Sequence, residues 1–288
     1  MSDAPVYIIT GATHGIGRAA AIELARRGAH LGLVVRSEAK AAQTRADIQR
    51  EAPGVAVDVF LADLSVLDDV RRVARQLDEH YARIDVLVNN AGLHAFTQRV
   101  TVDGLPEMVA VNYVAPWLLT DLLRDKLIAS APSRVVNVAS DAHRQVRTLE
   151  PERHLRSTED FSMAESFELY ARTKLMDILF TQELARRLAG TGVTANSCCP
   201  GLNASGLGRE SKVFNGLAGL FSRLGILSPA RGARILVRLA SDPEFKEVSG
   251  GFFSTTRRFR SLPPAPICRD AELQRRLWRA TAELVGRS

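Results

Sequence analysis

Tyr170 and Lys174 are the two residues whose types and spacing most directly suggest chemistry. They are four residues apart in a segment with helical periodicity, so their side chains lie on the same face of the predicted helix. An isolated tyrosine hydroxyl has a pKa of about 10, too high for an efficient base at neutral pH, and a neighbouring ammonium group lowers that value. The pair therefore predicts a general acid/base for a reaction that moves a proton to or from oxygen.

Ser140 and Asn112 are the other two candidate catalytic residues. Ser140 follows a predicted strand, at the carboxyl edge where open α/β sheets bind ligands. Its hydroxyl can hold a substrate oxygen, or it can cap a turn. Asn112 precedes Pro116 by four residues in a predicted helix, and a proline has no N–H to donate to the carbonyl of residue 112. That carbonyl can bind an ordered water that extends a proton path from Lys174, or the proline can simply kink the helix.

A glycine-rich turn over residues 10–17 separates the first predicted strand from the first predicted helix, with the spacing G-x-x-x-G-x-G. Glycines let the backbone turn tightly and approach a pyrophosphate, which a helix N-terminus attracts. A plain tight turn also uses glycine, but the position after a strand and before a helix favours a dinucleotide site. The residues expected to contact the cofactor are Gly11, Thr13, His14, Gly15, Ile16 and Gly17.

The end of the second predicted strand distinguishes NAD(H) from NADP(H). An acidic residue there accepts hydrogen bonds from the ribose 2′-OH, whereas a basic residue suits a 2′-phosphate. The strand ends at Arg36, no acidic residue occurs before Glu38, and His14 can add a second donor. The sequence therefore predicts a preference for NADP(H), with NAD(H) possible; the alternative is that Arg36 is an ordinary surface residue.

Three further segments follow predicted strands. Asp63 can accept from an adenine amino group with Leu64 packed nearby, or it can cap a helix. Asn89-Asn90-Ala91-Gly92 suits the close approach of a ribose or of a neighbouring loop, or it is a turn that ends the strand. Pro200-Gly201 can pack against a nicotinamide, with Ser205 holding the carboxamide.

Short apolar runs alternate with longer amphipathic ones along the chain, which predicts a parallel sheet with helices on both faces. Parallel strands buried on both faces are continuously apolar, as in Val86-Leu87-Val88. The predicted strands are Val6–Thr10, His30–Val35, 55–61, Val86–Asn89, 134–139, 193–198 and 251–254. Helices are predicted from Ile16 to a capping Gly28 and over about 107–128, 167–188 and 273–284.

The composition is that of an ordinary globular protein, with 46% hydrophobic and 24% charged residues in 288. Three cysteines without framework spacing argue against a disulfide scaffold, and no His or Cys spacing indicates a metal site. The net charge of +6 is spread along the chain, densest at Arg257, Arg258 and Arg260, so we expect a solvated surface rather than nucleic-acid binding. With neither a signal peptide nor a run of apolar residues that could span a membrane, we expect a cytoplasmic protein.

Together these residues resemble the short-chain dehydrogenase/reductase family. The motifs occur in the family's order over residues 5–255 and, as an ordered set, are highly specific. The resemblance implies a Rossmann-type doubly wound fold with a seven-stranded parallel sheet, three layers and one domain. It also implies a catalytic tetrad of Asn112, Ser140, Tyr170 and Lys174, in which Tyr170 is the acid/base, Lys174 lowers its pKa and binds ribose, Ser140 steadies the substrate oxygen and Asn112 anchors a water relay.

A narrower likeness points to the retinol dehydrogenase and WW-domain oxidoreductase branch. It rests on residues 101–104, 133–143 and 179–184 and on the 30-residue interval from Ser140 to Tyr170. Members of that branch typically carry a membrane anchor or a further domain, and we expect neither here. Ala139 also departs from the usual double serine, so what carries over is the broad class of lipophilic alcohols and carbonyls.

No linker divides the chain before a Pro-rich stretch at Pro263–Pro266, so we expect a catalytic domain over residues 1–256 and a C-terminal extension over 257–288 with a short helix. The family resemblance implies a substrate lid at about 202–228. The lid region is apolar and can exclude water above an apolar substrate; the alternatives are a core or dimer contact, or contact with a membrane surface. Its apolar residues are Val213, Phe214, Leu217, Leu220, Phe221, Leu224 and Leu227, with Arg209, Lys212 and Arg223 beside them.

The expected function is that of an NADP(H)-dependent oxidoreductase acting on a small lipophilic alcohol or carbonyl compound. By resemblance we also expect a homo-oligomer that pairs through the helices of Asn112 and Tyr170. Two alternatives remain: a regulatory protein that binds the cofactor at a vestigial site, and a reductase attached peripherally to a membrane.

Overall fold

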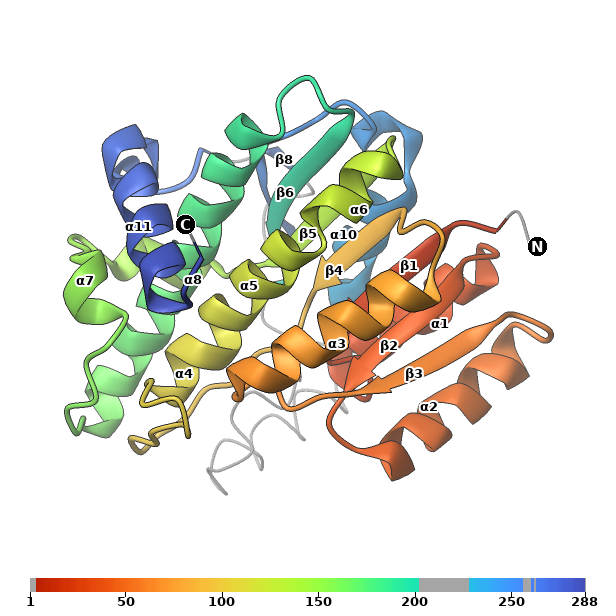
Figure 1. Ribbon diagram of the computed structural model, residues 1–288, viewed down its shortest axis with the longest axis horizontal. Helices are drawn as coiled ribbons and strands as arrows, with labels where there is room; N and C mark the ends of the chain where they lie inside the picture. Colours follow the sequence, from red (N-terminus) through yellow and green to blue (C-terminus); the bar gives the residue numbers. More distant parts are fainter. Residues whose placement is uncertain (1–3, 202–227, 256–259, 262, 288) are drawn as a thin grey trace.

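A parallel sheet forms the middle layer of the computed structural model, which describes residues 4–201, 228–255, 260–261 and 263–287 (Figure 1). Within these residues the strand order is β3-β2-β1-β4-β5-β6-β7-β8. The strands are β1 (Val6–Thr10), β2 (His30–Val35), β3 (Val57–Leu61), β4 (Val86–Asn89), β5 (Ser133–Val138), β6 (Val193–Cys199), β7 (Phe252–Ser254) and β8 (Arg260–Ser261). β1 and β4 are buried along their whole length, as strands covered on both faces should be.

The first seven strands are all parallel, which confirms the predicted seven-stranded sheet. β8 was not predicted; it pairs antiparallel with β7 and consists of two residues. The direction in which strands are added reverses between β1 and β4. At such a reversal the connecting segments leave on opposite sides, so a crevice opens at the carboxyl ends of the two strands.

Each face of the sheet is covered by helices. On one face lie α1 (Gly15–Arg26), α2 (Glu38–Glu51) and α10 (Pro229–Ser241), and on the other lie α3 (Leu67–His80), α5 (Ala115–Leu122) and α8 (Met163–Arg187). In Figure 1 the second group is in front of the sheet. Successive strand residues point to opposite faces, so Ile9 belongs to the first core and Ile8 to the second. Gly28 has a positive φ of 84° after α1, as predicted for its capping position.

The segment expected as one helix over about 107–128 is helical, but it is not a single regular α-helix. That segment is divided into α4 (Glu107–Val109), a π-helical turn (Ala110–Val114), α5, and α6 (Arg124–Ala129). Pro116 lacks the N–H that would bond to the carbonyl of Asn112 in an α-helix, and a wider π turn accommodates such a break. The break therefore occurs around Asn112, one of the candidate catalytic residues.

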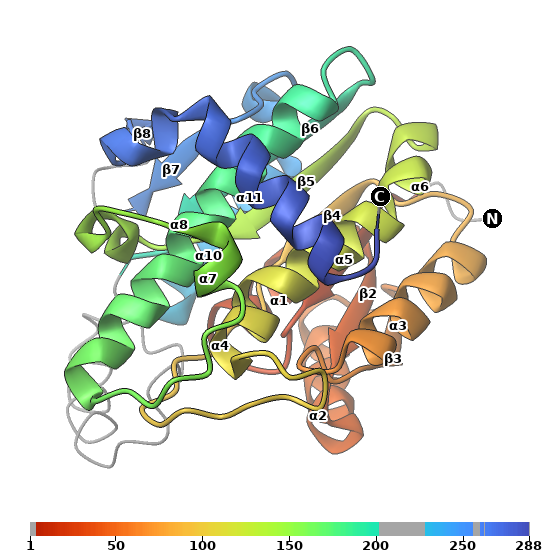
Figure 2. The same ribbon diagram turned by 60° about the vertical axis from the view of Figure 1, so that its left-hand side comes forward.

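The C-terminal helix α11 (Ala271–Leu284) lies beside α8 and on the same side of the sheet (Figures 1 and 2). The Trp278 ring packs edge-on against Trp117 at 5.0 Å, and the Arg187 guanidinium is 4.4 Å from the Trp278 ring centroid. The Tyr113 and Thr281 hydroxyls are 2.7 Å apart. Since α11 shares this core, the domain boundary at residue 257 stays a prediction. A short helix, α7 (Pro151–His154), precedes α8.

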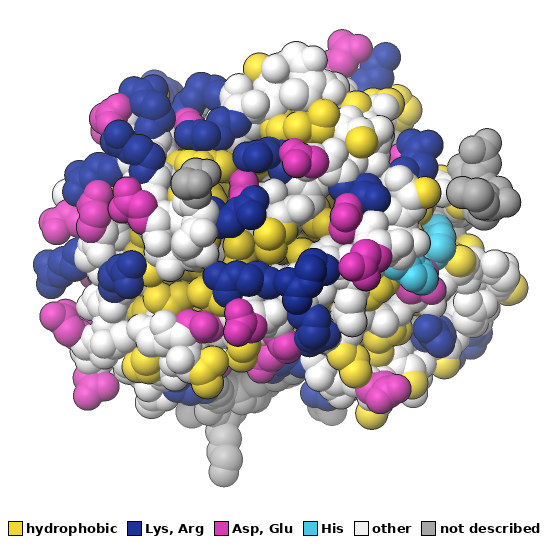
Figure 3. All heavy atoms as spheres, in the orientation of Figure 1, with side chains coloured by type: hydrophobic (Ala, Val, Ile, Leu, Met, Phe, Trp, Pro, Cys, Tyr) yellow, Lys and Arg dark blue, Asp and Glu magenta, His cyan; other side chains and the backbone are white. Residues whose placement is uncertain are grey.

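Basic and acidic side chains are interspersed on the face shown in Figure 3, rather than gathered into patches of one sign. None of the helices among the described residues is both long enough and apolar enough to cross a membrane. Residues 202–227 of the predicted lid, including Ser205, lie outside the described residues, as do Arg257 and Arg258.

Candidate active site

The carboxyl ends of the central strands open onto a cleft of about 620 Å³. Of the predicted site residues that the structure describes, all but Gly15 and Asn112 line it. These are Gly11, Thr13, His14, Ile16, Gly17, Arg36, Asp63, Leu64, Asn90, Ala91, Gly92, Ser140, Tyr170, Lys174, Pro200 and Gly201. Gly15 begins α1 just behind the turn, and Asn112 is buried behind the cleft wall.

The glycine turn forms a cradle that has no room for side chains. Gly11 has a φ of +70°, and a Cβ atom there would lie 2.9 Å from the Ala91 Cα. A Cβ on Gly17 would lie 2.6 Å from the Gly11 carbonyl oxygen. Asn90 closes the turn from β4, since its Nδ2 donates to the Thr10 carbonyl oxygen at 2.9 Å. The exposed backbone at the start of α1 fits a pyrophosphate group, which would lie against the helix N-terminus.

Two cations line the cleft at the end of β2. Arg36 is exposed, as is Lys40 in the first turn of α2, and neither side chain has a hydrogen-bond or ion-pair partner among the residues that the structure describes. Ser37 caps α2 by accepting from the Lys40 backbone N–H at 3.4 Å, which fixes the helix start beside Arg36. Sequence analysis missed Lys40, although it follows Arg36 by only four residues.

Asp63 does not cap a helix, which was the alternative to its contact with an adenine amino group. Its Oδ1 accepts from the backbone N–H and the hydroxyl of Ser65, at 2.9 and 2.8 Å. The N-cap position of α3 is Val66, and the Asp103 carboxylate accepts from the first helical N–H, that of Leu67, at 2.8 Å. Asp63 is therefore not the cap of α3, and its turn holds the carboxylate at the cleft.

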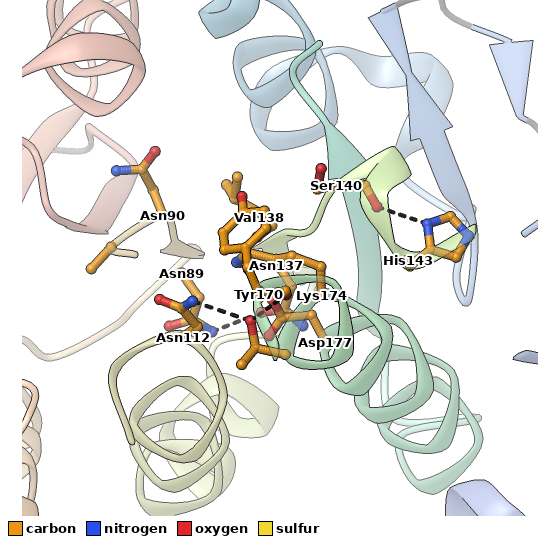
Figure 4. Close-up of polar contacts among 12 residues, drawn as sticks. Asn89, Asn90, Asn112, Asn137, Val138, Ser140, His143, Tyr170, Lys174 and Asp177 are labelled. Carbon is orange, nitrogen blue, oxygen red and sulfur yellow. Dashed lines mark hydrogen bonds and ion pairs between the residues drawn. The ribbon is translucent and has the colours of Figure 1, made fainter. Parts of the chain in front are cut away.

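Tyr170 and Lys174 lie on the face of α8 that lines the cleft (Figure 4). α8 starts with a capping box between Ser162 and Glu165, four residues before the predicted start, and this fixes the helix register. The Lys174 Nζ is 5.8 Å from the Tyr170 ring centroid. The predicted pair is thus brought together, with Ser140 also at the cleft.

The pKa of Tyr170 is raised above its ordinary value, contrary to the sequence expectation of a net lowering. Burial is the largest cause, and Cys199 and Asp177 act in the same direction. The Lys174 ammonium and a hydrogen bond with the Ser140 hydroxyl act to lower it. The effect predicted for Lys174 is therefore present, but burial outweighs it.

Lys174 is itself held by groups that sequence analysis did not identify. Its Nζ donates to the Val138 carbonyl oxygen at 2.8 Å and to the Asp177 carboxylate at 2.9 Å. Burial acts to lower the pKa of Lys174, but Asp177 and Tyr170 outweigh burial and raise it. Asp177 lies three residues after Lys174, so helical spacing alone could have revealed this contact.

Ser140 has the capping role that the sequence left open, and it also lines the cleft. It follows β5 directly and caps the short helical turn Asp141–Gln145, its hydroxyl accepting from the Ala142 N–H at 3.2 Å. His143 in that turn lies 2.7 Å from the Ser140 carbonyl oxygen through its Nδ1. The turn therefore fixes the backbone of Ser140 while its hydroxyl remains at the cleft.

Asn112 positions other parts of the site through its side chain. Its Oδ1 accepts from the Leu93 N–H at 2.8 Å, and its Nδ2 donates to the Leu93 carbonyl at 2.9 Å and to the Thr173 hydroxyl at 3.1 Å. The amide thereby joins the loop after β4 to α8, close to Lys174 (Figure 4). The sequence argument concerned only the backbone carbonyl of Asn112 and did not foresee these side-chain contacts.

An aromatic cluster lies beside Tyr170 and was also missed. The His94 ring is stacked on the Tyr170 ring, with centroids 5.0 Å apart and an interplanar angle of 23°. Phe96 and Phe167 lie 4.6 and 4.8 Å from His94, and the Phe167 side chain is exposed. His94 therefore lines the cleft next to the candidate acid/base and is backed by two further aromatic rings. Within the described part of the chain, no group of three or more His, Cys, Asp or Glu residues is arranged to hold a metal ion.

Comparison with known proteins gives concordant results. The family model described as short chain dehydrogenase matches residues 5–150. Retinol dehydrogenase 13 of Mus musculus is 37% identical over 97% of this chain and 83% of its own length. Retinol dehydrogenase 14 of Homo sapiens is 35% identical over 97% of this chain and 85% of its own length.

Solved structures show the same fold. An uncharacterized protein from Mycobacterium Paratuberculosis superposes with a TM-score of 0.77 and 28% identity, covering 99% of this chain and 97% of that one. Actinorhodin polyketide ketoreductase with NADPH gives a TM-score of 0.67 at 23% identity, covering 88% of this chain and 96% of that one, which shows a likeness of fold alone.

Proposed function

The chain belongs to the short-chain dehydrogenase family, and on that premise we propose that it transfers a hydride between NADP(H) and a lipophilic alcohol, aldehyde or ketone, with Tyr170 as general acid/base. The observation that carries the proposal is the convergence of Tyr170, Lys174 and Ser140 on one cleft whose opposite wall is the glycine turn. A proton donor, a fixed cation and an oxygen-binding hydroxyl are the groups that carbonyl reduction needs from the protein.

The chain's own residues handle the substrate oxygen and its proton. When bound, the nicotinamide supplies or accepts the hydride. In carbonyl reduction the Tyr170 hydroxyl gives its proton to the substrate oxygen, while the Ser140 hydroxyl holds that oxygen. In alcohol oxidation the Tyr170 phenolate takes the proton from the alcohol. Lys174 stabilises the phenolate and would hold a ribose hydroxyl of the bound cofactor, and Asn112 holds the loop after β4 against α8, which carries Tyr170 and Lys174.

The proposed preference for NADP(H) rests on Arg36 and Lys40, two cations without partners among the described residues. Both suit a 2′-phosphate, and no carboxylate lies at the strand end to bind a free 2′-OH. We expect Arg36→Asp to shift the ratio of kcat/KM values from NADPH towards NADH by about tenfold or more, the effect of one charge-assisted hydrogen bond. Lys246→Asp, an exposed cation outside the cleft, is the control; an unchanged ratio in Arg36→Asp would mean that Arg36 does not bind the phosphate.

The aromatic cluster supports a lipophilic substrate. The His94 ring lines the cleft and is stacked on the Tyr170 ring, and Phe96 and Phe167 pack against His94. Met163 is also exposed near the start of the same helix. Relatives named as retinol dehydrogenases point to the same class, an alcohol or aldehyde on an apolar body.

The proposal is tested by following NADPH absorbance with a panel of aldehydes, ketones and lipophilic alcohols. We expect turnover by the wild-type protein and a loss of about a thousandfold in Tyr170→Phe, with NADPH affinity retained. Turnover that is unchanged in Tyr170→Phe would refute the acid/base role. Tight NADPH binding without turnover on any substrate would instead favour the regulatory protein with a vestigial site.

Assembly and location remain proposals. A homo-oligomer is expected from the family, but α11 packs on α8 and Trp117 and so covers part of the pairing surface that we predicted. Light scattering with size-exclusion chromatography measures the assembly. Cell fractionation and sedimentation with lipid vesicles distinguish a cytoplasmic protein from a peripherally attached reductase.

A further inference from the structure

Asp177 is a buried carboxylate that contacts the candidate active site from behind. It is 2% exposed, and Lys174, one helical turn earlier in α8, is 4% exposed. The Lys174 Nζ is fixed between the Asp177 carboxylate at 2.9 Å and the Val138 carbonyl oxygen at 2.8 Å (Figure 4). An ammonium group has three N–H donors, so these two contacts set the direction of the third, towards the cleft.

The two opposite charges act on Tyr170 in opposite directions. An ammonium near a phenol favours the phenolate, whereas a carboxylate disfavours it. Lys174 accordingly lowers the pKa of Tyr170, and Asp177 raises it. Because the pair is shielded from water, its fields are weakly screened, and the Asp177 charge cancels part of the effect of Lys174.

The other titratable groups near Tyr170 do not replace Asp177 as a counter-charge to Lys174. The titratable groups that lie near Tyr170 and Asp177 belong to the loop after β4, the π-helical turn, the segment after β5 and β6. They are His94, Tyr113, Asp141, Cys198 and Cys199. Burial raises the pKa of the Cys198 and Cys199 thiols and of the Tyr113 hydroxyl, so these three stay neutral at neutral pH. Asp141 is engaged by Arg144 and the Ser254 hydroxyl.

We propose that Asp177 is a positioning residue and counter-charge for Lys174: by holding Lys174 and partly neutralising it, Asp177 acts together with burial to keep the proton on Tyr170 at neutral pH. A protonated Tyr170 is the form that gives its proton to a carbonyl oxygen, whereas alcohol oxidation needs the phenolate. Resting on the proposed function, the inference is that carbonyl reduction proceeds up to alkaline pH and that alcohol oxidation is confined to alkaline pH.

The direct test is the titration of Tyr170 itself without cofactor or substrate. The phenolate absorbance of the protein is followed against pH, and the curve of Tyr170→Phe is subtracted, which isolates Tyr170 from the other three tyrosines. In Asp177→Asn, which keeps an oxygen for Lys174 but removes the charge, we expect the Tyr170 transition to move down by about one pH unit. Asp177→Glu restores the charge and should return the transition towards its wild-type position.

Asp85→Asn is the matched control, because Asp85 is another buried carboxylate and accepts from the Val6 N–H at the far end of the sheet. It should leave the Tyr170 transition in place. A folded Asp177→Asn protein whose Tyr170 transition is unchanged would overturn the inference. If Asp177→Asn does not fold, the wild-type titration is still a test. A Tyr170 transition well below about 10, the value of a free tyrosine, would overturn the inference.

Kinetics supply the second readout. In Asp177→Asn the acidic limb of the pH profile for alcohol oxidation should move down by the same unit, so oxidation at neutral pH should rise about tenfold relative to its own alkaline plateau. The KM for the alcohol should change little. Absence of any turnover together with a shifted Tyr170 titration would count against the proposed function but not against the role of Asp177, so the two failures are distinguishable.

Discussion

Two aspartates of this protein each accept hydrogen bonds within a polar cluster, but their pKa values are shifted in opposite directions. Asp58 in β3 accepts from His30 at 2.7 Å, Tyr81 at 2.8 Å and His80 at 3.1 Å, and we call these four residues the outer cluster. Asp177 accepts from the Lys174 ammonium. We call Asp177, Lys174 and Tyr170 the catalytic cluster, after the role proposed above for Tyr170.

The two carboxylates differ in donors and in access to water. Burial acts to raise the pKa of Asp58, but hydrogen bonds from His30, Tyr81 and His80 outweigh it and the net direction is downward. Asp177 is more deeply buried, and burial outweighs Lys174 and raises its pKa to about 6. Three donors and a partly exposed site make Asp58 a stabilising acceptor. Asp177 accepts from one charged group, Lys174, at a site shielded from water. Its charge therefore acts strongly on the pKa values of Lys174 and Tyr170.

The largest expected effect comes from removing the cation of the catalytic cluster. In Lys174→Met we expect kcat/KM with NADPH to fall by about a thousandfold, since the phenolate loses its stabilising charge. The fold should survive, because without the ammonium the Asp177 carboxyl takes up a proton rather than staying charged and buried. Turnover and circular dichroism are measured together, with His30→Asn in the outer cluster as the control. If both variants lost turnover equally, the contrast between the clusters would fail.

The next effect is a pH dependence of stability with opposite signs at the two aspartates. The raised pKa of Asp177 means that the folded state holds a proton that the unfolded state releases, so its contribution to stability falls as pH rises from about 4 to about 6. The lowered pKa of Asp58 gives stability that is present above about 4, its unfolded value, and is lost as pH falls further.

Urea unfolding of Asp177→Asn and of wild type between about pH 4 and pH 6 measures how the contribution of Asp177 to stability changes with pH. Relative to wild type, the variant should become more stable as pH rises through the window, by more than about 1 kcal/mol, because each pKa unit corresponds to about 1.4 kcal/mol. A difference that is flat with pH would show that Asp177 is not protonated in the folded protein within that window.

Local sequence patterns were enough to predict most of the cleft. The glycine turn, Arg36, Asn90, Ser140, Tyr170 and Lys174 each follow a strand or share a helix face, so their types and spacing placed them at one sheet edge. Lys40 and Asp177 were missed although each lies within four residues of a recognised residue. The capping box at Ser162 was also readable in the sequence and would have given the correct start of α8.

What sequence patterns do not contain is the pairing of distant segments. The outer cluster joins His30, Asp58 and His80 from two strands and a helix, and its geometry depends on the register that pairs Gly32 with Asp58. Likewise, the side-chain contacts of Asn112 with Leu93 and Thr173 depend on the π turn and on how α8 packs. Such contacts follow from tertiary packing, which local spacing does not specify.

Removing the central carboxylate of the outer cluster should affect stability alone. In Asp58→Asn we expect the free energy of unfolding to fall by about 1–2 kcal/mol, a value reduced from that of a fully buried charged acceptor because the side chain is 33% exposed. Turnover should equal that of wild type, since Asp58 lies in the amino-terminal half of β3, away from the cleft. Chemical denaturation and the NADPH assay measure the two quantities; a fall in turnover of tenfold or more would link the outer cluster to the site.

The smallest effect separates the donors within the outer cluster. His80 is 49% exposed and its Nε2 is 3.1 Å from the carboxylate, whereas His30 is 22% exposed and lies at 2.7 Å. An exposed pair gains little, because water replaces the lost partner. We therefore expect His80→Ala to lower the free energy of unfolding by about 0.5 kcal/mol and His30→Ala by at least twice as much. Denaturation midpoints at pH 7 measure both. Equal losses in the two variants would mean that contacts other than exposure and distance to Asp58 decide the stability of this cluster, such as the ring packing of His80 against Phe60 and Tyr81.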